Sequence, residues 1–84
     1  MLTPTTNDAE ALALAAMAAT LTDERRARRF LDLTGLEVDE LRDRALLGAT
    51  IAFLESYEPD LVAVAAAIGS SPDRLVAARE ILER

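Results

Sequence analysis

The sequence predicts an all-α protein, a compact orthogonal bundle of five to six short helices around a buried central helix. Apolar residues recur at helical spacing, and no segment alternates between apolar and polar residues for long enough to predict a strand. Two of the three Pro and two of the three Gly stand where helices are expected to begin or end. The 84 residues are 51 % hydrophobic, too few for two domains and too apolar for a disordered chain. We therefore expect one helical domain over residues 1–84, with residues 1–6 as a disordered N-terminal tail.

The first helix is expected over residues 7–20. Asn7 and Glu10 have the spacing of a capping box, and Asp8 lies in the first turn, where the helix dipole favours an acid. The other positions are mostly Ala, which allows a close approach between helices. One face carries the larger apolar side chains Leu14, Met17 and Leu21.

The second helix is expected to begin after Thr22 as its N-cap, with two acids in the first turn. Gly35 is expected to end it in the left-handed conformation. Leu31 and Leu36 then stand at the two positions whose side chains meet in a Schellman motif.

The middle of the chain predicts a third helix over residues 38–44 and a fourth over residues 46–56, and it leaves open whether the two are continuous. Gly48 inside the fourth helix costs about 1 kcal/mol relative to Ala, so we expect another helix to cross closely there. Apolar side chains spread around more than one face, as is typical of a buried helix: Leu46, Leu47, Ile51, Phe53, Leu54 and Tyr57.

The last two helices are marked by proline. Pro59 suits the first position of a helix that ends at Gly69, with an inner face of Leu61, Val64, Ala65 and Ile68. Ser71, Pro72 and Asp73 combine an N-cap, a proline and an acid, which predicts the start of another helix. Its apolar stripe consists of Leu75, Ala78 and Leu82.

The composition excludes several kinds of chemistry. The chain has no Cys and no His, which excludes disulfides, a catalytic thiol, the usual zinc sites and triads that use histidine. Acids cluster at residues 37–43, but their spacing is not that of an EF-hand loop. We therefore expect no enzyme activity, no cofactor and no metal site.

The chain has 15 acids and nine basic residues, all of them Arg, for a net charge of −6. Residues 11–21 form an apolar run, but the residues before it include two acids and no Arg or Lys, unlike a signal peptide. The run is also shorter than the roughly 20 residues that span a membrane. We expect a cytoplasmic protein with no membrane association.

Four of the nine arginines fall within five residues: Arg25, Arg26, Arg28 and Arg29. This arginine cluster has two interpretations. It is either a docking patch for an acidic protein surface, a phosphate or the backbone of RNA, or a solvated face that pairs with neighbouring acids such as Asp23 and Glu24. The sequence leaves both open.

The corner at residues 64–79 resembles a DNA-binding helix-turn-helix, with Gly69 in the turn. Its nucleic-acid contacts would be Ser71, Arg74 and Arg79. Ser70 stands where such motifs usually bury an aliphatic side chain. A chain of net charge −6 without Lys lacks the basic stripe that neutralises phosphates, so nucleic acid is not the expected partner.

Three segments together resemble a known family. They are Asp8 to Leu14, the stretch Arg29-Phe30-Leu31-Asp32-Leu33-Thr34-Gly35-Leu36, and the corner from Gly69 to Leu75. They are similar to the alphaproteobacterial domain of unknown function family 3572, and the resemblance spans about residues 8–82. It implies a small helical protein and no particular activity or site. Members often have a Gly-Asp-Pro break between the third and fourth helices, where this chain has Ala45-Leu46-Leu47-Gly48.

These observations predict a non-enzymatic protein–protein interaction or regulatory module, with Arg25, Arg28 and Arg29 as polar anchors for a protein partner. The alternative is a helix-turn-helix nucleic-acid-binding protein. Two broadly apolar helices in so short a chain also predict self-association as a homodimer, which would bury the excess apolar surface.

Overall fold

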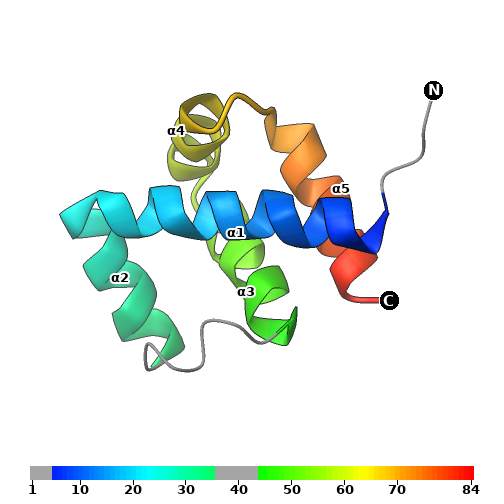
Figure 1. The fold of residues 1–84 in the computed structure, drawn as a ribbon. Helices are drawn as coiled ribbons and strands as arrows, with labels where there is room; N and C mark the ends of the chain where they lie inside the picture. Colours follow the sequence, from blue (N-terminus) through cyan, green and yellow to red (C-terminus); the bar gives the residue numbers. More distant parts are fainter. Residues whose placement is uncertain (1–4, 36–43) are drawn as a thin grey trace.

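The computed structural model describes residues 5–35 and 44–84, and these residues form five helices and no strand (Figure 1). The helices are α1 (Thr6–Thr22), α2 (Glu24–Thr34), α3 (Arg44–Glu55), α4 (Glu58–Ala67) and α5 (Pro72–Leu82). The prediction of an all-α protein is confirmed. The helix expected over residues 38–44 lies outside the described residues except for Arg44, and so does Leu36.

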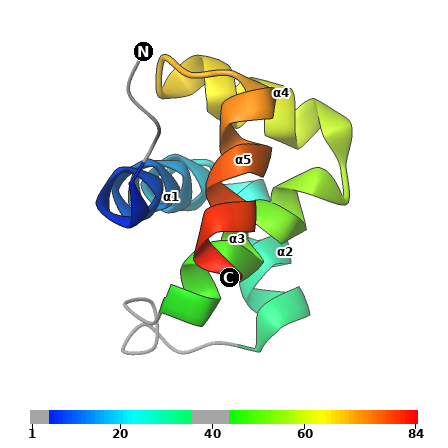
Figure 2. The same ribbon diagram turned by 90° about the vertical axis from the view of Figure 1, so that its right-hand side faces the viewer.

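The longest helix, α1, packs against all four others and lies along one edge of the molecule (Figures 1 and 2). The three residues that were expected to share one face differ in burial: Met17 is buried and Leu21 is partly buried, whereas Leu14 is 48 % exposed. The buried face consists of small side chains and one Met, namely Ala9, Ala13, Ala16, Met17 and Thr20. Small side chains let α1 approach the bundle closely. The inner face of α1 therefore consists mostly of alanines and not of leucines.

Both ends of α1 differ slightly from the prediction. Thr5, not Asn7, is the N-cap: its hydroxyl accepts from the Asp8 N–H at 3.1 Å, and the Asp8 carboxylate accepts from the Thr5 N–H at 2.9 Å. This capping box lowers the pKa of Asp8, chiefly through the bond from the Thr5 backbone. At the other end, Thr22 belongs to α1, and Asp23 is both the C-cap of α1 and the N-cap of α2.

Helix α3 packs against α1, α4 and α5. Five of the six apolar residues predicted for this buried helix are buried, namely Leu46, Leu47, Ile51, Phe53 and Leu54. Tyr57 differs from the prediction, because it lies beyond the end of α3 and is 45 % exposed. The ring of Phe53 meets that of Phe30 on α2 edge to face, with centroids 5.1 Å apart. A Cβ built on Gly48 would lie 3.6 Å from Glu83 Cγ and 4.0 Å from Leu82 Cβ, so α5 approaches α3 closely there.

The corner between α4 and α5 matches the sequence prediction most closely. Gly69 has a φ of 68° and ends α4 in a Schellman motif, in which the Ser70 N–H donates to the Ala65 carbonyl at 2.8 Å. Ser71 is the N-cap of α5 and accepts from the Arg74 N–H at 3.3 Å. The two helices meet at 97°.

The chain has a radius of gyration of 11.8 Å, close to the roughly 12 Å expected for a compact domain of this length. The bundle measures 38 × 25 × 18 Å. Within the described residues no single helix is both long and apolar enough to cross a membrane; α4 and α5 pass on length and composition only as a bent pair.

Candidate functional site

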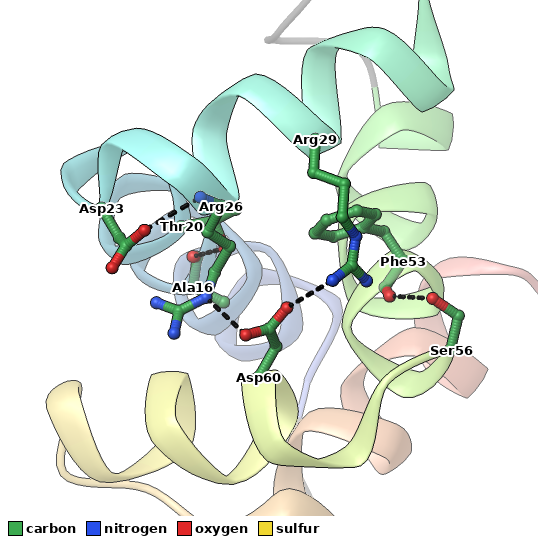
Figure 3. Close-up of polar contacts among 8 residues, drawn as sticks. All are labelled: Ala16, Thr20, Asp23, Arg26, Arg29, Phe53, Ser56 and Asp60. Carbon is green, nitrogen blue, oxygen red and sulfur yellow. Dashed lines mark hydrogen bonds and ion pairs between the residues drawn. The ribbon is translucent and has the colours of Figure 1, made fainter.

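The arginine cluster lies on α2, and two of its members turn inward to one carboxylate on α4 (Figure 3). Arg26 Nε donates to Asp60 Oδ1 at 3.0 Å, and Arg29 Nη1 lies 3.3 Å from Asp60 Oδ2. Asp60 is 4 % exposed and Arg26 has only 14 % of its side chain exposed. This ion network therefore connects α2 with α4.

Local structure explains why Asp60 is tolerated in a buried position. It lies in the first turn of α4, where the helix dipole favours a negative charge. Each carboxylate oxygen also has its own arginine, so the buried charge is paired. The spacing of the arginines on α2, three residues apart, points both guanidinium groups toward the same carboxylate.

Arg29 is held from a second side by two aromatic rings. Its guanidinium carbon lies 5.1 Å from the ring centroid of Phe53 and 5.1 Å from that of Tyr57. Both distances are within the range of a cation–π contact. Arg29 is 41 % exposed, so it stays in contact with solvent while it fills the space between α2 and the end of α3.

The other two arginines of the cluster point outward. Arg28 is 74 % exposed and forms an ion pair with Glu24, one turn earlier on α2, at 3.7 Å. Arg25 is exposed, and within the described ranges no ion pair involves it. Together with Asp23, these side chains line an open depression of about 410 Å³. The Arg26 N–H bond lowers the pKa of the Asp23 carboxyl, with smaller help from the charges of Arg26 and Arg25.

The cluster therefore divides into an inner pair, Arg26 and Arg29, and an outer pair, Arg25 and Arg28. Sequence reasoning missed Asp60 because it lies 34 residues from Arg26, and no local pattern links the two. The outer pair is the more exposed, and its members form no ion pair with α4 among the described residues.

The residues of the alternative nucleic-acid site are also divided. Arg74 is exposed, and the Ser71 hydroxyl is engaged in capping α5. Arg79 is held by two carboxylates: it donates to both oxygens of Glu55 on α3 and to Glu83 Oε2 at 2.8 Å. The Glu55 carboxylate raises the pKa of Arg79 further. Arg79 therefore ties α5 to α3 and has little capacity left for a phosphate.

A second candidate surface, which sequence reasoning missed, is the α1 outer face, formed by Ala11, Leu14, Ala15 and Ala18. All four are exposed and lie on the side of α1 opposite its buried residues. No charged residue occurs between Glu10 and Asp23. In Figure 2, where α1 is seen along its axis, the other helices lie on one side of it only. The signal was available in the sequence, since a helix apolar on every side must expose one apolar face when it packs at an edge.

Among the described residues no group of three acids could hold a metal ion. The predicted acid cluster at residues 37–43 lies outside them.

The described residues form a small all-α domain. The chain belongs to the family described as "Protein of unknown function (DUF3572)", whose model matches residues 6–84. This confirms the resemblance inferred from the sequence. A search of the curated proteins found no match, and neither did a search of the solved structures.

Proposed function

We propose that this protein is a non-enzymatic protein–protein interaction module of the cytoplasm, and that the α1 outer face is its contact surface. The observation that carries the proposal is the exposure of Leu14, at 48 %, within a helical face that has no charge for three turns. A surface helix of a monomeric protein normally presents charged and polar residues to solvent. A contiguous apolar face more often marks a surface that binds another protein.

The outer pair of arginines supports the same proposal. Arg25 and Arg28 are exposed and stand in the first turns of α2, just beyond the end of α1. They would act as polar anchors at one end of the apolar face. Arg26 and Arg29, which we also expected to take part, form ion pairs with Asp60, so the proposal gives the anchoring role to Arg25 and Arg28.

The proposal is tested by purifying tagged protein from its native host, with Leu14→Asp as the disabled variant. Val62→Asp is the matched control, because Val62 is also 48 % exposed but lies on α4. We expect a bound protein, either a different chain or a second copy, with the wild type and the control and not with Leu14→Asp. Equal retention by all three would refute the α1 outer face, and no bound protein with any of them would refute the function.

A helix-turn-helix nucleic-acid-binding protein is the second candidate, and the 97° corner between α4 and α5 favours it. The charge of the corner opposes it: the exposed face of α5 includes Asp73 and Glu80 as well as Arg74. A shift of labelled DNA or RNA at low salt, lost on Arg74→Glu, would support this candidate. No shift at low salt, where phosphate binding is strongest, would end it.

The arrangement of the helices around α3 belongs to the same proposal. We propose an orthogonal bundle with α3 at its centre, supported by the packing of α3 against three other helices and by the 97° corner between α4 and α5.

A further inference from the structure

We infer that α1 can be exchanged between two copies of this chain with Asp23 as the hinge, so that the surface which α1 covers binds the α1 of a second copy. Asp23 is also the residue that favours the closed monomer. The inference goes beyond the proposed function, because α1 uses its buried face in both forms and the α1 outer face stays exposed. Three properties support it: the connection of α1 to the fold, the backbone of Asp23, and the side chains at the hinge.

A single connection joins α1 to the other helices. Asp23 is the one residue between α1 and α2, and α2 turns sharply away from the axis of α1 there (Figure 1). Helix α1 nevertheless packs against all four other helices and supplies Ala9, Ala13, Ala16 and Met17 to the hydrophobic core. Exposing this core to water is costly, so the surface is covered either by the α1 of the same chain or by an identical helix. A second copy brings that helix with the contacts already present in the structure, which is the basis of domain swapping.

The backbone of Asp23 differs from that of a helix in one angle. Its φ of −88° lies at the edge of the helical range, whereas its ψ of 116° is extended. Rotation about ψ therefore joins the two helices into one that spans residues 6–34 and is about 44 Å long. The joined helix takes α1 away from its own site, and the α1 of a second copy replaces it there.

The side chains at the hinge favour the break between the helices. The Asp23 carboxylate accepts from the Arg26 N–H at 2.9 Å and caps α2, a contact that a continuous helix loses. Thr22 and Asp23 are also among the weaker helix formers. The joined helix gains backbone hydrogen bonds, because it pairs N–H and C=O groups that lack an intrahelical partner at helix ends. Since both forms bury the same face of α1, the balance between them is decided at the hinge.

The exchange brings the two hinges together, because the end of each α1 keeps its place beside the start of α2 in the other copy. The two-fold axis therefore passes between the two Asp23 residues. Each copy contributes two acids there, Asp23 and Glu24, and two bases, Arg25 and Arg26. The charges near the axis are balanced, so the exchange depends on the surfaces that α1 already covers and not on attraction between oppositely charged patches.

The concentration at which the dimer forms follows from the balance at the hinge. A short connection gives α1 an effective concentration at its own site of millimolar or more, so we expect the wild type to dimerise only above about 1 mM. Asp23→Ala removes a cap from the closed form and favours the joined helix, at two hinges in each dimer. The dimer should then form at a concentration on the order of a hundredfold lower. Thr22→Ala keeps the cap and should lower this concentration about tenfold.

Sedimentation equilibrium tests the exchange on chains refolded from urea at each concentration, so that closed monomers are not trapped. We expect Asp23→Ala to dimerise at about 10 µM and Asp23→Asn, which retains a capping side chain, to behave as the wild type. Ser71→Ala is the matched control, because it removes the N-cap of a helix that does not directly follow another, and it should stay a monomer. An Asp23→Ala monomer at about 1 mM, or equal dimerisation of Ser71→Ala, would overturn the inference. If Asp23→Ala does not fold, Thr22→Ala that dimerises no more readily than the wild type would overturn it.

The distance between two labels on one chain distinguishes exchange from association of closed chains. The sequence has no cysteine, so Ala11→Cys with Asp32→Cys places spin labels at exposed positions of α1 and α2 and nowhere else. The two positions lie about 32 Å apart along the joined helix, whereas the turn at Asp23 brings them closer in the closed chain. Labelled Asp23→Ala diluted into an excess of unlabelled Asp23→Ala reports the distance within one chain. We expect about 32 Å in the dimer, and a dimer that keeps the closed-chain distance would overturn the inference.

The exchange is separable from the contact surface proposed above. Leu14 is on the α1 outer face, which neither form buries. Adding Leu14→Asp to Asp23→Ala should therefore leave the dimer and its label distance unchanged. Loss of the dimer in the double variant would show that the copies associate through the α1 outer face, and it would overturn the exchange.

Discussion

Replacing Asp60 with Ala removes the carboxylate that Arg26 and Arg29 share. Arg26 is mostly buried, so it would be left in the fold without a counter-charge. Breaking a buried ion pair in this way costs about 3–5 kcal/mol, and the partial exposure of Arg26 places the cost near the lower end. Arg29 is 41 % exposed, so solvent screening limits its pair to roughly 0–1 kcal/mol. We expect the free energy of unfolding to fall by about 3–4 kcal/mol.

Urea unfolding followed by far-ultraviolet circular dichroism measures this loss. A domain of this length has a total stability of roughly 4–13 kcal/mol, so Asp60→Ala should lower the urea midpoint by about 2 M or leave the chain partly unfolded. Arg28→Ala is the first control, since its exposed pair with Glu24 should contribute less than about 1 kcal/mol. Asp73→Ala, in the first turn of α5, measures the share that comes from the helix dipole alone.

Two results would refute this reasoning. One is a loss below about 1 kcal/mol for Asp60→Ala, which would mean that Arg26 reaches water once its partner is gone. The other is an equal loss for Asp60→Ala and Asp73→Ala, which would mean that Asp60 stabilises the fold only through the helix dipole and not through its arginines. A double variant, Asp60→Leu with Arg26→Met, should recover most of the stability, because apolar residues of similar size replace the buried pair.

Three further predictions concern stability. Gly48→Ala should raise the free energy of unfolding by about 0.5–1 kcal/mol, because its Cβ would meet α5 only at ordinary contact distances; a destabilised variant would contradict this. Ser70→Ala should be stabilising by up to about 1 kcal/mol, because the buried Ser70 hydroxyl has no hydrogen-bond partner among the described residues. A lower free energy of unfolding for this variant in urea would show that the hydroxyl does have a partner. Asp8 and Asp23 have lowered pKa values in the fold, so their stabilisation is present above the ordinary value of 3.8 and is lost as the pH falls through the folded-state pKa. The double variant Asp8→Asn, Asp23→Asn should therefore lose less stability than the wild type as the pH falls from about 4 to about 2. An unchanged pH dependence of the free energy of unfolding would contradict this assignment.

Local chemistry explains which helix ends the sequence could predict. Ser71 caps α5 as predicted, because three successive residues favour the same helix start: a hydroxyl at the N-cap, a proline at the first position and an acid in the first turn. At the start of α1, two pairs have capping spacing, Thr5 with Asp8 and Asn7 with Glu10, and nothing local decides between them. The longer helix is formed, and it buries Ala9 against the bundle.

Tertiary contacts explain what the sequence could not predict. The inner face of α1 depends on how closely a helix can approach its neighbours, and hydropathy ranks leucine above alanine without regard to that distance. Likewise, which arginines of the cluster turn inward depends on the position of Asp60 on α4. The spacing of residues along α2 gives no information about that position. The charges of the cluster are evident in the sequence. The direction of the inner side chains depends on Asp60, which lies 34 residues from Arg26.

The way α2 is attached has a consequence for the motions of the molecule. Among its described residues, Phe30 is the one that is fully buried. The other contacts with α3 and α4 described above are polar: the ion pairs with Asp60 and the stacking of Arg29 on Phe53 and Tyr57. Segments with few buried apolar contacts open by local unfolding at a free energy below that of global unfolding. The amide hydrogens of α2 should therefore exchange with solvent sooner than those of α3, and Asp60→Ala should hasten the exchange of α2 most. Equal protection of the two helices would show that α2 opens only when the whole domain unfolds.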